Sequence, residues 1–253
     1  MRINKYISET GVYPRRETDR LIAAGRITIN GQPCEKGAQV EPGDLVAVDG
    51  EPITTVKGEP VYLALNKPVG ITCTSSREVE GNIIDFVGYP SRIFAVGRLD
   101  KHSEGLILLT NDGSIVNRMM RSENGHEKEY SVTVDKLVTD EFLQRMSAGV
   151  EILGTRTKPC KTSRISGTEF RIVLTQGLNL QIRRMCKELG YRVLRLERIR
   201  IMNITLSGLE LGQWRHLKQE ELAELIGMLS EAGEQVLVGK RELISSQNQK
   251  FGD

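Results

Sequence analysis

Apolar residues recur at helix-like and strand-like spacings in two differently organised parts of the chain. In the first part, residues 1–55, they predict two short helices, the second ending at Gly25 in a left-handed stop position. A β-branched run then ends in Asn30-Gly31, a pair that favours a tight hairpin. The predicted elements are helices at 3–10, ended by Gly11, and at 15–24, and strands at 26–29 and 45–48. Residues 51–60, with two prolines and a glycine, are expected to form a linker.

After the linker, aliphatic and β-branched runs bounded by turn residues alternate irregularly with helical patterns. Strands are predicted at 61–65, 93–96, 106–110, 130–134 and 171–175, and helices at 114–120, 141–148, 181–189 and 219–229. Strands mixed with helices, without a regular strand–helix–strand alternation, favour an α+β fold around a mixed or antiparallel sheet. We expect this second domain over residues 60–232 and a weakly structured tail over residues 233–253.

Two of the predicted helices carry a clear apolar stripe. The helix at 181–189 and the helix at 219–229 each repeat apolar residues three and four positions apart, so each should pack one face on the core. The stripes are Ile182, Met185, Cys186 and Leu189 in the first, and Leu222, Leu225, Ile226 and Leu229 in the second. Arg183 lies beside the first stripe, where its guanidinium could reach a partly buried carboxylate. Further arginines follow in a strand-like segment, at positions 192, 195, 198 and 200.

Composition limits the classes of partner and site. The formal net charge is only +2, so a nucleic-acid ligand would require positive charge gathered locally. The four cysteines form no CxxC pair and there are only three histidines, which argues against a zinc site and a disulfide framework. Neither an apolar signal core nor a run long enough to span a bilayer is present. We expect a soluble cytoplasmic protein that binds neither metal nor membrane.

The N-terminal part is locally basic. Residues 1–36 hold seven basic side chains against four acidic ones, and guanidinium groups on a helix surface suit phosphate contact. A solvated helix face explains the same charges equally well. The stretch RINKYISETGVYPRRETDRLIAAGRITINGQ, however, resembles an S4 RNA-binding domain. This resemblance implies that the second helix and the hairpin face structured RNA, with Arg15, Arg16 and Arg20 as candidate contacts, and it implies no chemistry.

Asp100 stands in a loop between two strand-like runs, within the stretch GRLDKHSEGLILLTNDG. Functional side chains concentrate on such loops because the strands position them rigidly. Aspartate also favours turns for local hydrogen-bonding reasons. From the pattern alone, a turn-forming aspartate and a reactive carboxylate both remain open.

Four motifs in order over residues 61–229 resemble those of the RNA pseudouridine synthases of the RsuA branch. They are LNKPVG, GRLDKHSEGLILLTNDG, EKEYSVTV and RIVLTQGLNLQIRRM. The stretches MSAGVEILGT and LERIRIMNITLSGLELGQWRHL are most similar to the large-subunit synthases of type F. The chain departs from the family pattern at Ser103, where threonine is common, and at Leu180, where arginine is common. The second departure removes a cation and leaves the details of RNA backbone contact open.

The resemblance implies a specific reaction: the C1′–N1 bond of a uridine breaks, the uracil turns, and C5 bonds to C1′, without any cofactor. Asp100 would be the essential ionised carboxylate, which either attacks the sugar or removes a sugar proton. Tyr130 would face the uracil, and Arg183 would face the aspartate and favour its charged form. Three further residues are candidates for RNA contact, namely Arg98, which would fill the gap left by the flipped-out uridine, Arg184 and Lys67. Lys67 with Pro68 is also expected to shape the pocket floor.

The expected partner is 23S ribosomal RNA near the peptidyl transferase region, with a tRNA uridine as the alternative, and the protein is expected to be a monomer. Two other classes of function remain. A non-catalytic RNA-binding protein of ribosome assembly would need only the S4 unit and basic helices. A nucleoside or glycoside hydrolase would need a second carboxylate, for which Glu104 and Asp112 are candidates.

Overall fold

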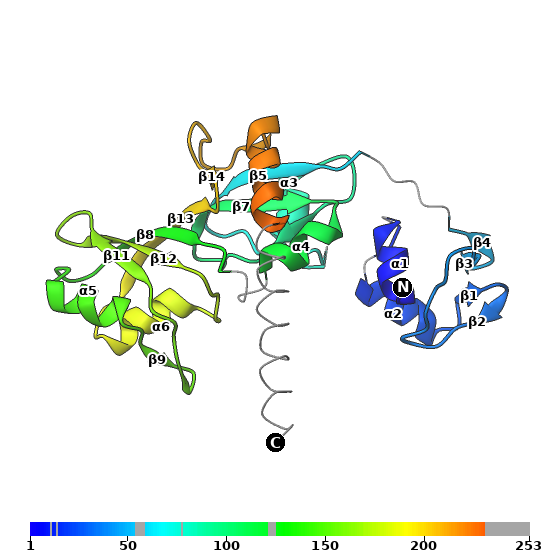
Figure 1. The fold of residues 1–253 in the computed structure, drawn as a ribbon, viewed down its shortest axis with the longest axis horizontal. Helices are drawn as coiled ribbons and strands as arrows, with labels where there is room; N and C mark the ends of the chain where they lie inside the picture. Colours follow the sequence, from blue (N-terminus) through cyan, green and yellow to red (C-terminus); the bar gives the residue numbers. More distant parts are fainter. Residues whose placement is uncertain (11, 14, 54–58, 77, 121–124, 231–253) are drawn as a thin grey trace, which may run out of the picture. The chain divides into compact units, whose positions relative to one another are not determined.

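The computed structural model describes residues 1–253 except 11, 14, 54–58, 77, 121–124 and 231–253 (Figure 1). The chain divides into two compact units: Met1–Pro60 with Asn111–Gly113, and Val61–Thr110 with Ser114–Asp253. The expected helix stop at Gly11, half of the expected linker (residues 54–58) and the whole of the expected tail lie outside the described residues.

The first unit consists of two helices and a four-stranded antiparallel sheet. Helices α1 (Ile3–Glu9) and α2 (Arg15–Ala23) precede strands β1 (Ile27–Ile29), β2 (Gln32–Pro33), β3 (Val46–Val48) and β4 (Glu51–Pro52), in the sheet order β2-β1-β3-β4. Asn30 and Gly31 join β1 to β2 with positive φ angles of 54° and 78°, as a two-residue hairpin requires. Its core joins both helices to the sheet through buried Ile3, Ile22 and Val46. Two helices and a small sheet, as predicted, therefore form this unit.

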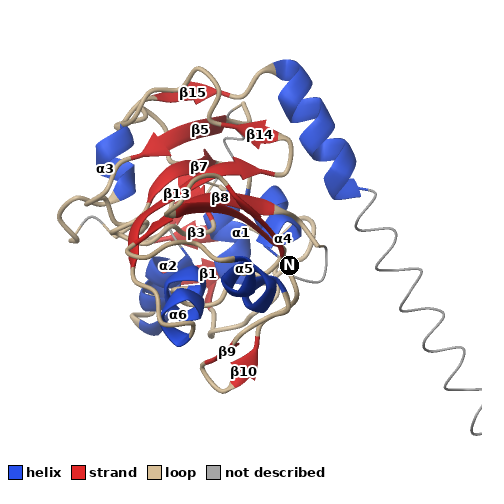
Figure 2. Cartoon of the chain, turned by 90° about the vertical axis from the view of Figure 1, so that its left-hand side faces the viewer, coloured by secondary structure: helices blue, strands red, loops and turns tan. Residues whose placement is uncertain are grey.

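The second unit is built on a nine-stranded mixed sheet of order β11-β12-β8-β13-β7-β5-β15, on which β14 pairs with β13 and β6 with β7 (Figure 2). Its strands are β5 (Tyr62–Lys67), β6 (Phe94–Val96), β7 (Glu104–Thr110), β8 (Lys128–Val134), β11 (Lys161–Arg164), β12 (Glu169–Leu174), β13 (Val193–Ile201), β14 (Ile204–Thr205) and β15 (Trp214–His216). A separate hairpin joins β9 (Glu151–Ile152) to β10 (Thr155–Arg156). Strands β13 and β7 are parallel and the other pairs are antiparallel, which confirms the expected mixed sheet in an α+β fold.

Helices cover the sheet in separate patches. The labelled helices are α3 (Ile83–Val87), α4 (Gly113–Met120), α5 (Asp140–Ser147) and α6 (Gln181–Glu188), and a further helix covers residues 219–230. Helices α5 and α6 share one core with β8 and β12, whereas α4 and the helix at 219–230 share another with β7 and β13. The stripe of α6 packs on the core as predicted. In the last helix Leu225 and Leu229 are buried, but Ile226 is 40% exposed, so that part of the prediction is wrong.

A glycine is required where β7 meets β13. Gly105 has a φ of +104°, and a Cβ there would lie 2.3 Å from the carbonyl oxygen of Arg198 and 2.7 Å from its nitrogen. Both contacts are backbone atoms in the parallel β7–β13 pairing, so they cannot move aside without opening the sheet.

We expect Gly105→Ala to lower the free energy of unfolding by about 3 to 5 kcal/mol, because strain at positive φ adds to a backbone clash. The matched control is Gly154→Ala, where φ is +71° but no atom lies within 4 Å, so only about 1 kcal/mol should be lost. Urea titration followed by the fluorescence of Trp214, the one tryptophan of the chain, reports on the second unit. Equal losses in the two variants would contradict the clash.

Candidate active site

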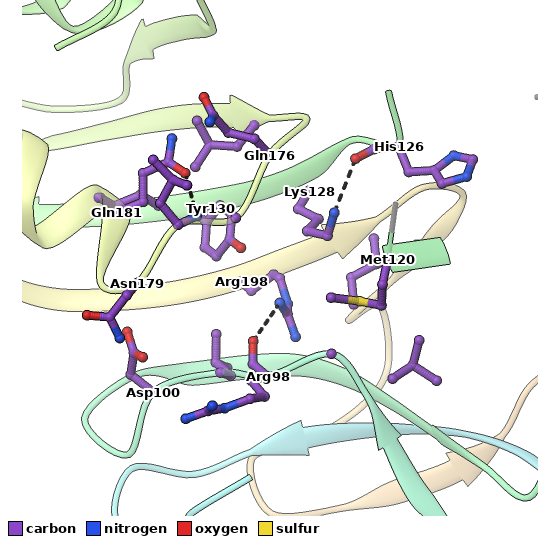
Figure 3. A pocket seen from close by; sticks show the side chains of 18 of the residues that line it. Arg98, Asp100, Met120, His126, Lys128, Tyr130, Gln176, Asn179, Gln181 and Arg198 are labelled. Atoms are coloured by element: carbon purple, nitrogen blue, oxygen red, sulfur yellow. Dashed lines mark hydrogen bonds between the residues drawn. The ribbon is translucent and has the colours of Figure 1, made fainter. Parts of the chain in front are cut away.

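A pocket of about 410 Å³ opens in the second unit where the ends of several strands meet (Figure 3). The loop between β6 and β7 contributes Arg98 and Asp100, and strand β8 contributes Lys128 and Tyr130. Arg198 reaches it from β13, and residues 176–182 line it ahead of and into α6. Two of the three predicted catalytic residues, Asp100 and Tyr130, thus line one cavity although they belong to different motifs. The volume is in the range that holds a small ligand or one nucleoside.

The loop that carries Asp100 is fixed at several points. Ser103 N–H donates to the carbonyl of Asp100 at 3.0 Å, so the residue does form a turn through its backbone. Gly70 of the LNKPVG motif donates to the carbonyl of Lys101 at 2.8 Å. These bonds use backbone atoms of the loop, and the half-buried carboxylate of Asp100 remains available to the pocket. The turn is therefore present, and it leaves the Asp100 side chain at the pocket, so that the reactive role of the carboxylate stays a prediction.

Arg183 holds the same loop from α6. One of its terminal nitrogens, Nη2, donates to the carbonyl of His102 at 2.7 Å and to the hydroxyl of Ser103 at 3.2 Å. Its Nε is buried and has no partner among the described residues. No ion pair joins Arg183 to Asp100 in the described part of the chain, which differs from the expected direct opposition. The guanidinium instead bonds to His102 and Ser103, because the turn that follows Asp100 brings these two residues next to α6.

Strand geometry brings Lys128, Tyr130 and Arg198 to one face. Lys128 and Tyr130 are two residues apart on β8, and Arg198 on β13 is the cross-strand partner of Tyr130. The guanidinium of Arg198 stands 6.0 Å from the centre of the Tyr130 ring. Lys128 and Arg198 were not among the predicted site residues. The spacing Lys-Glu-Tyr in EKEY could have indicated Lys128, because alternate residues of a strand share a face.

Burial perturbs the cations near the pocket. Desolvation, with a smaller contribution from the charge of Arg198, lowers the pKa of Lys128 to about 8. The His126 carbonyl accepts from the Lys128 ammonium at 3.3 Å (Figure 3). Burial also lowers the pKa of the His126 ring. The pocket is thus a poorly hydrated environment in which charge is costly unless it is compensated.

Lys67 does not have the expected role. Its side chain is 0% exposed, and its ammonium donates to the carbonyls of Pro68 at 2.8 Å and Ile71 at 3.0 Å. Burial lowers its pKa. An enclosed ammonium cannot reach an RNA phosphate, so the prediction of RNA contact is wrong for Lys67. It instead fixes the turn of the LNKPVG motif, and neither Lys67 nor Pro68 is among the residues that line the pocket.

The remaining predicted residues lie at three places. Arg184 donates twice to Asn179, at 3.1 and 3.2 Å, and so fixes the segment before α6. Leu180 lines the pocket with a left-handed φ of 51° and a 36% exposed side chain, so the arginine common in the family would stand at the pocket rim. Three arginines of α2 are exposed, and two of them, Arg16 and Arg20, lie opposite its buried residues; the third is Arg15.

The candidate second carboxylates of a hydrolase do not line this pocket. Glu104 is paired with Arg195 at 2.5 Å and belongs to strand β7. Asp112 falls in the short segment grouped with the first unit.

Among the described residues, no three His, Cys, Asp or Glu side chains are grouped so that they could hold a metal ion. None of the described helices is long and apolar enough to cross a membrane.

Comparison with known proteins assigns both units. A family described as RNA pseudouridylate synthase matches residues 61–188, and the S4 domain matches residues 1–46. The dual-specificity RNA pseudouridine synthase RluF of Escherichia coli K12 is 52% identical over 93% of this chain and 82% of its own length. Ribosomal large subunit pseudouridine synthase B of Bacillus subtilis is 31% identical over 88% of this chain and 95% of its own.

A solved structure gives the same result. The crystal structure of a pseudouridylate synthase, 29% identical, superposes with a TM-score of 0.66 over 89% of this chain and 99% of its own. With an S4 domain at its N-terminus and a catalytic unit of RluF type, the chain belongs to the RNA pseudouridine synthases, enzymes that isomerise uridine within RNA.

Proposed function

We propose that this enzyme isomerises a uridine of 23S ribosomal RNA and that Asp100 is the carboxylate on which the reaction depends. The observation that carries the proposal is the meeting of Asp100 and Tyr130 in one pocket of about 410 Å³. Asp100 is the only carboxylate among the described residues that line it. One carboxylate suits an isomerisation, whereas hydrolysis of a glycosidic bond ordinarily uses two with a water between them.

Each of the site residues has a separate role in this reaction. Asp100 bonds to the sugar or removes a sugar proton as the C1′–N1 bond breaks, and Tyr130 offers a flat face to the uracil. Arg98 is exposed at the rim, where its side chain suits the space that the uridine leaves in the RNA stack. Arg183 keeps the Asp100 loop in place through His102 and Ser103. No step requires a redox or metal cofactor, because no electron is transferred and no water is consumed.

The choice of 23S RNA rests on the similarity to large-subunit synthases. The relative from Bacillus subtilis is named for the ribosomal large subunit, and the type-F resemblance covers most of the chain. The relative from Escherichia coli carries the name dual-specificity, which favours a second RNA class for this enzyme too, and we propose a tRNA uridine as that candidate. We propose that the enzyme acts as a monomer.

The test uses 23S RNA and tRNA that carry tritium at uridine C5, each incubated separately with the enzyme. Tritium release from 23S RNA with intact chains, followed by mapping of the modified position, is the expected result. Release from tRNA alone would overturn the choice of 23S RNA. Free uracil in the product would indicate a hydrolase, and binding without release would indicate a non-catalytic RNA-binding protein.

The arginines of α2 are proposed to bind RNA phosphates. Replacing Arg15, Arg16 and Arg20 together by glutamine should weaken RNA binding and reduce the slope of log affinity against log salt by roughly 0.7 to 0.9 for each phosphate that the variant leaves without its arginine. Filter binding between about 50 and 200 mM salt measures both quantities. The control is Arg26→Gln, since two nitrogens of Arg26 hold Asp49 in a forked contact, with Nε at 2.8 Å, whereas Arg20 has a single contact of 3.3 Å with Glu17. An unchanged slope in the triple variant would contradict phosphate binding by this helix.

A further inference from the structure

Arg198 is a buried cation with an unused donor. Its side chain is 3% exposed; Nε donates to the carbonyl of Leu106 at 2.7 Å and Nη1 to that of Arg98 at 3.4 Å. Its third nitrogen, Nη2, is buried and has no partner among the described residues. A buried guanidinium nitrogen left unpaired costs free energy. The unpaired nitrogen is accounted for if a bound ligand supplies the missing hydrogen-bond acceptor.

Lys128 places a second cation beside Arg198. Both residues line the pocket, and Figure 3 shows the Lys128 ammonium and the Arg198 guanidinium directed into the same part of it. The only bond of the ammonium in the described structure is to the carbonyl of His126, at 3.3 Å. Neither cation forms an ion pair with a described carboxylate, Asp100 included. Two positive charges therefore share a desolvated space in which none of the described residues neutralises them.

Arg200, two residues further along β13, is by contrast a cation whose charge is neutralised by carboxylates. Residues two apart on a strand normally share a face, but the β13–β8 register shifts between Arg198 and Arg200, so they point to opposite faces. Arg200 bonds to Glu127 at 2.9 Å and Glu129 at 2.8 Å. The bulge therefore separates the compensated arginine from the one that faces the pocket.

The proposed reaction supplies an anion at this place. When the C1′–N1 bond breaks, its electron pair stays on the uracil, whose negative charge spreads over N1, O2 and O4. When C5 has bonded to C1′, the C5 proton goes to solvent and N1 takes a proton from solvent, which balances the isomerisation. Fixed cations aimed at developing charge in a water-poor site are an efficient source of rate enhancement.

The symmetry of uracil suits such a pair of cations. A half-turn about the axis through N3 and C6 exchanges N1 with C5, and it exchanges O2 with O4 at the same time. Two donors placed on the side of the oxygens therefore meet the same pattern of acceptors before and after the turn. The base can therefore rotate while the two donors keep a carbonyl oxygen each as acceptor.

We propose that Lys128 and Arg198 bind the detached uracil as an anion, through its two carbonyl oxygens, while Tyr130 keeps its ring flat. This inference rests on the proposed function and deepens it. It assigns catalytic roles to two residues outside the predicted site. An RNA phosphate could satisfy the same cations, but Arg198 is enclosed in the pocket, whereas the exposed Arg98 is the cation within reach of the backbone.

The test measures single-turnover rates on the mapped RNA site with uridine and with 5-fluorouridine, whose fluorine stabilises a uracil anion. Loss of the starting nucleoside after nuclease digestion reports both reactions. Lys128→Met should slow the uridine reaction by about 10² to 10³-fold, as removal of one donor to a developing anion does. The deficit should be at least ~10-fold smaller for 5-fluorouridine, because less anion stabilisation is then needed. Lys128→Arg should recover most of the rate, since it keeps a cation in place.

Controls separate the alternatives. Lys187→Met removes an exposed lysine of α6 that does not line the pocket and should leave both rates unchanged. If the melting curve of Arg198→Met shows a folded protein, this variant should behave as Lys128→Met does. If Arg198→Met does not fold, the test rests on Lys128→Met alone. Equal deficits on the two nucleosides, a wild-type rate, or weaker RNA binding with a smaller salt slope would each overturn the inference. Inactivity of the wild-type enzyme on uridine would instead overturn the proposed function.

Discussion

Asp100→Asn is expected to abolish tritium release from 23S RNA, with a loss of about 10⁴-fold or more in the single-turnover rate. The amide has the shape of the carboxylate but neither attacks a sugar carbon nor removes a sugar proton. The turn should survive, because Ser103 N–H bonds to the backbone carbonyl of residue 100 and not to its side chain. The fold and the RNA affinity of the variant should therefore match the wild type within about threefold.

Glu104→Gln is the matched control for Asp100→Asn. It also replaces a carboxylate on the GRLDKHSEGLILLTNDG motif, but Glu104 is committed to Arg195 and lies outside the pocket. Its loss should reduce stability by up to about 1 kcal/mol and leave the rate within about threefold. Tritium release by Asp100→Asn at the wild-type rate would remove Asp100 from the mechanism. Full activity in Asp100→Asn with loss in Glu104→Gln would move the essential carboxylate to Glu104.

The sequence predicted the elements that place Asp100, because those elements depend on local signals. The hairpin at Asn30-Gly31, the apolar stripe of α6 and the β-branched runs of β5 to β8 all appear close to their expected bounds. The loop between β6 and β7 followed from the two strands that enclose it. Asp100 and Tyr130 reach one pocket through the pairing of β8, β13 and β7, which no local pattern specifies. For them the four ordered motifs supplied the link.

Three features depend on tertiary packing and were therefore not predicted. The lysine of LNKPVG has the charge that RNA contact requires, yet two backbone carbonyls enclose it. Arg198 and Arg200 look alike in the sequence, and only the register shift in β13 sends them to opposite faces. Arg183 was expected to face Asp100, but the turn presents His102 and Ser103 to it instead. In each case the residue type indicated the kind of interaction, but the sequence did not show which group the side chain contacts.

Arg183→Gln is expected to lower kcat by about 10²-fold while changing the KM for RNA by less than about threefold, because a misplaced reactive group costs rate before it costs binding. The physical reason is the loss of both bonds that join α6 to the loop after Asp100. Steady-state tritium release gives kcat and KM separately. A rise in KM with unchanged kcat would show that Arg183 serves RNA binding alone.

Two further variants decide whether Arg183 acts by position or by charge. Arg183→Lys keeps the charge but offers no planar fork, so a positioning role predicts little rescue, whereas direct charge stabilisation of Asp100 predicts substantial rescue. Charge stabilisation would also move the acid limb of the pH–rate profile to higher pH in Arg183→Gln, and positioning would leave that limb in place. Ser103→Ala removes one of the two acceptors, and in the double variant with Arg183→Gln its effect should largely disappear. Because Arg183 contacts the loop and not the carboxylate, we expect little rescue by lysine, an unmoved acid limb and non-additive losses.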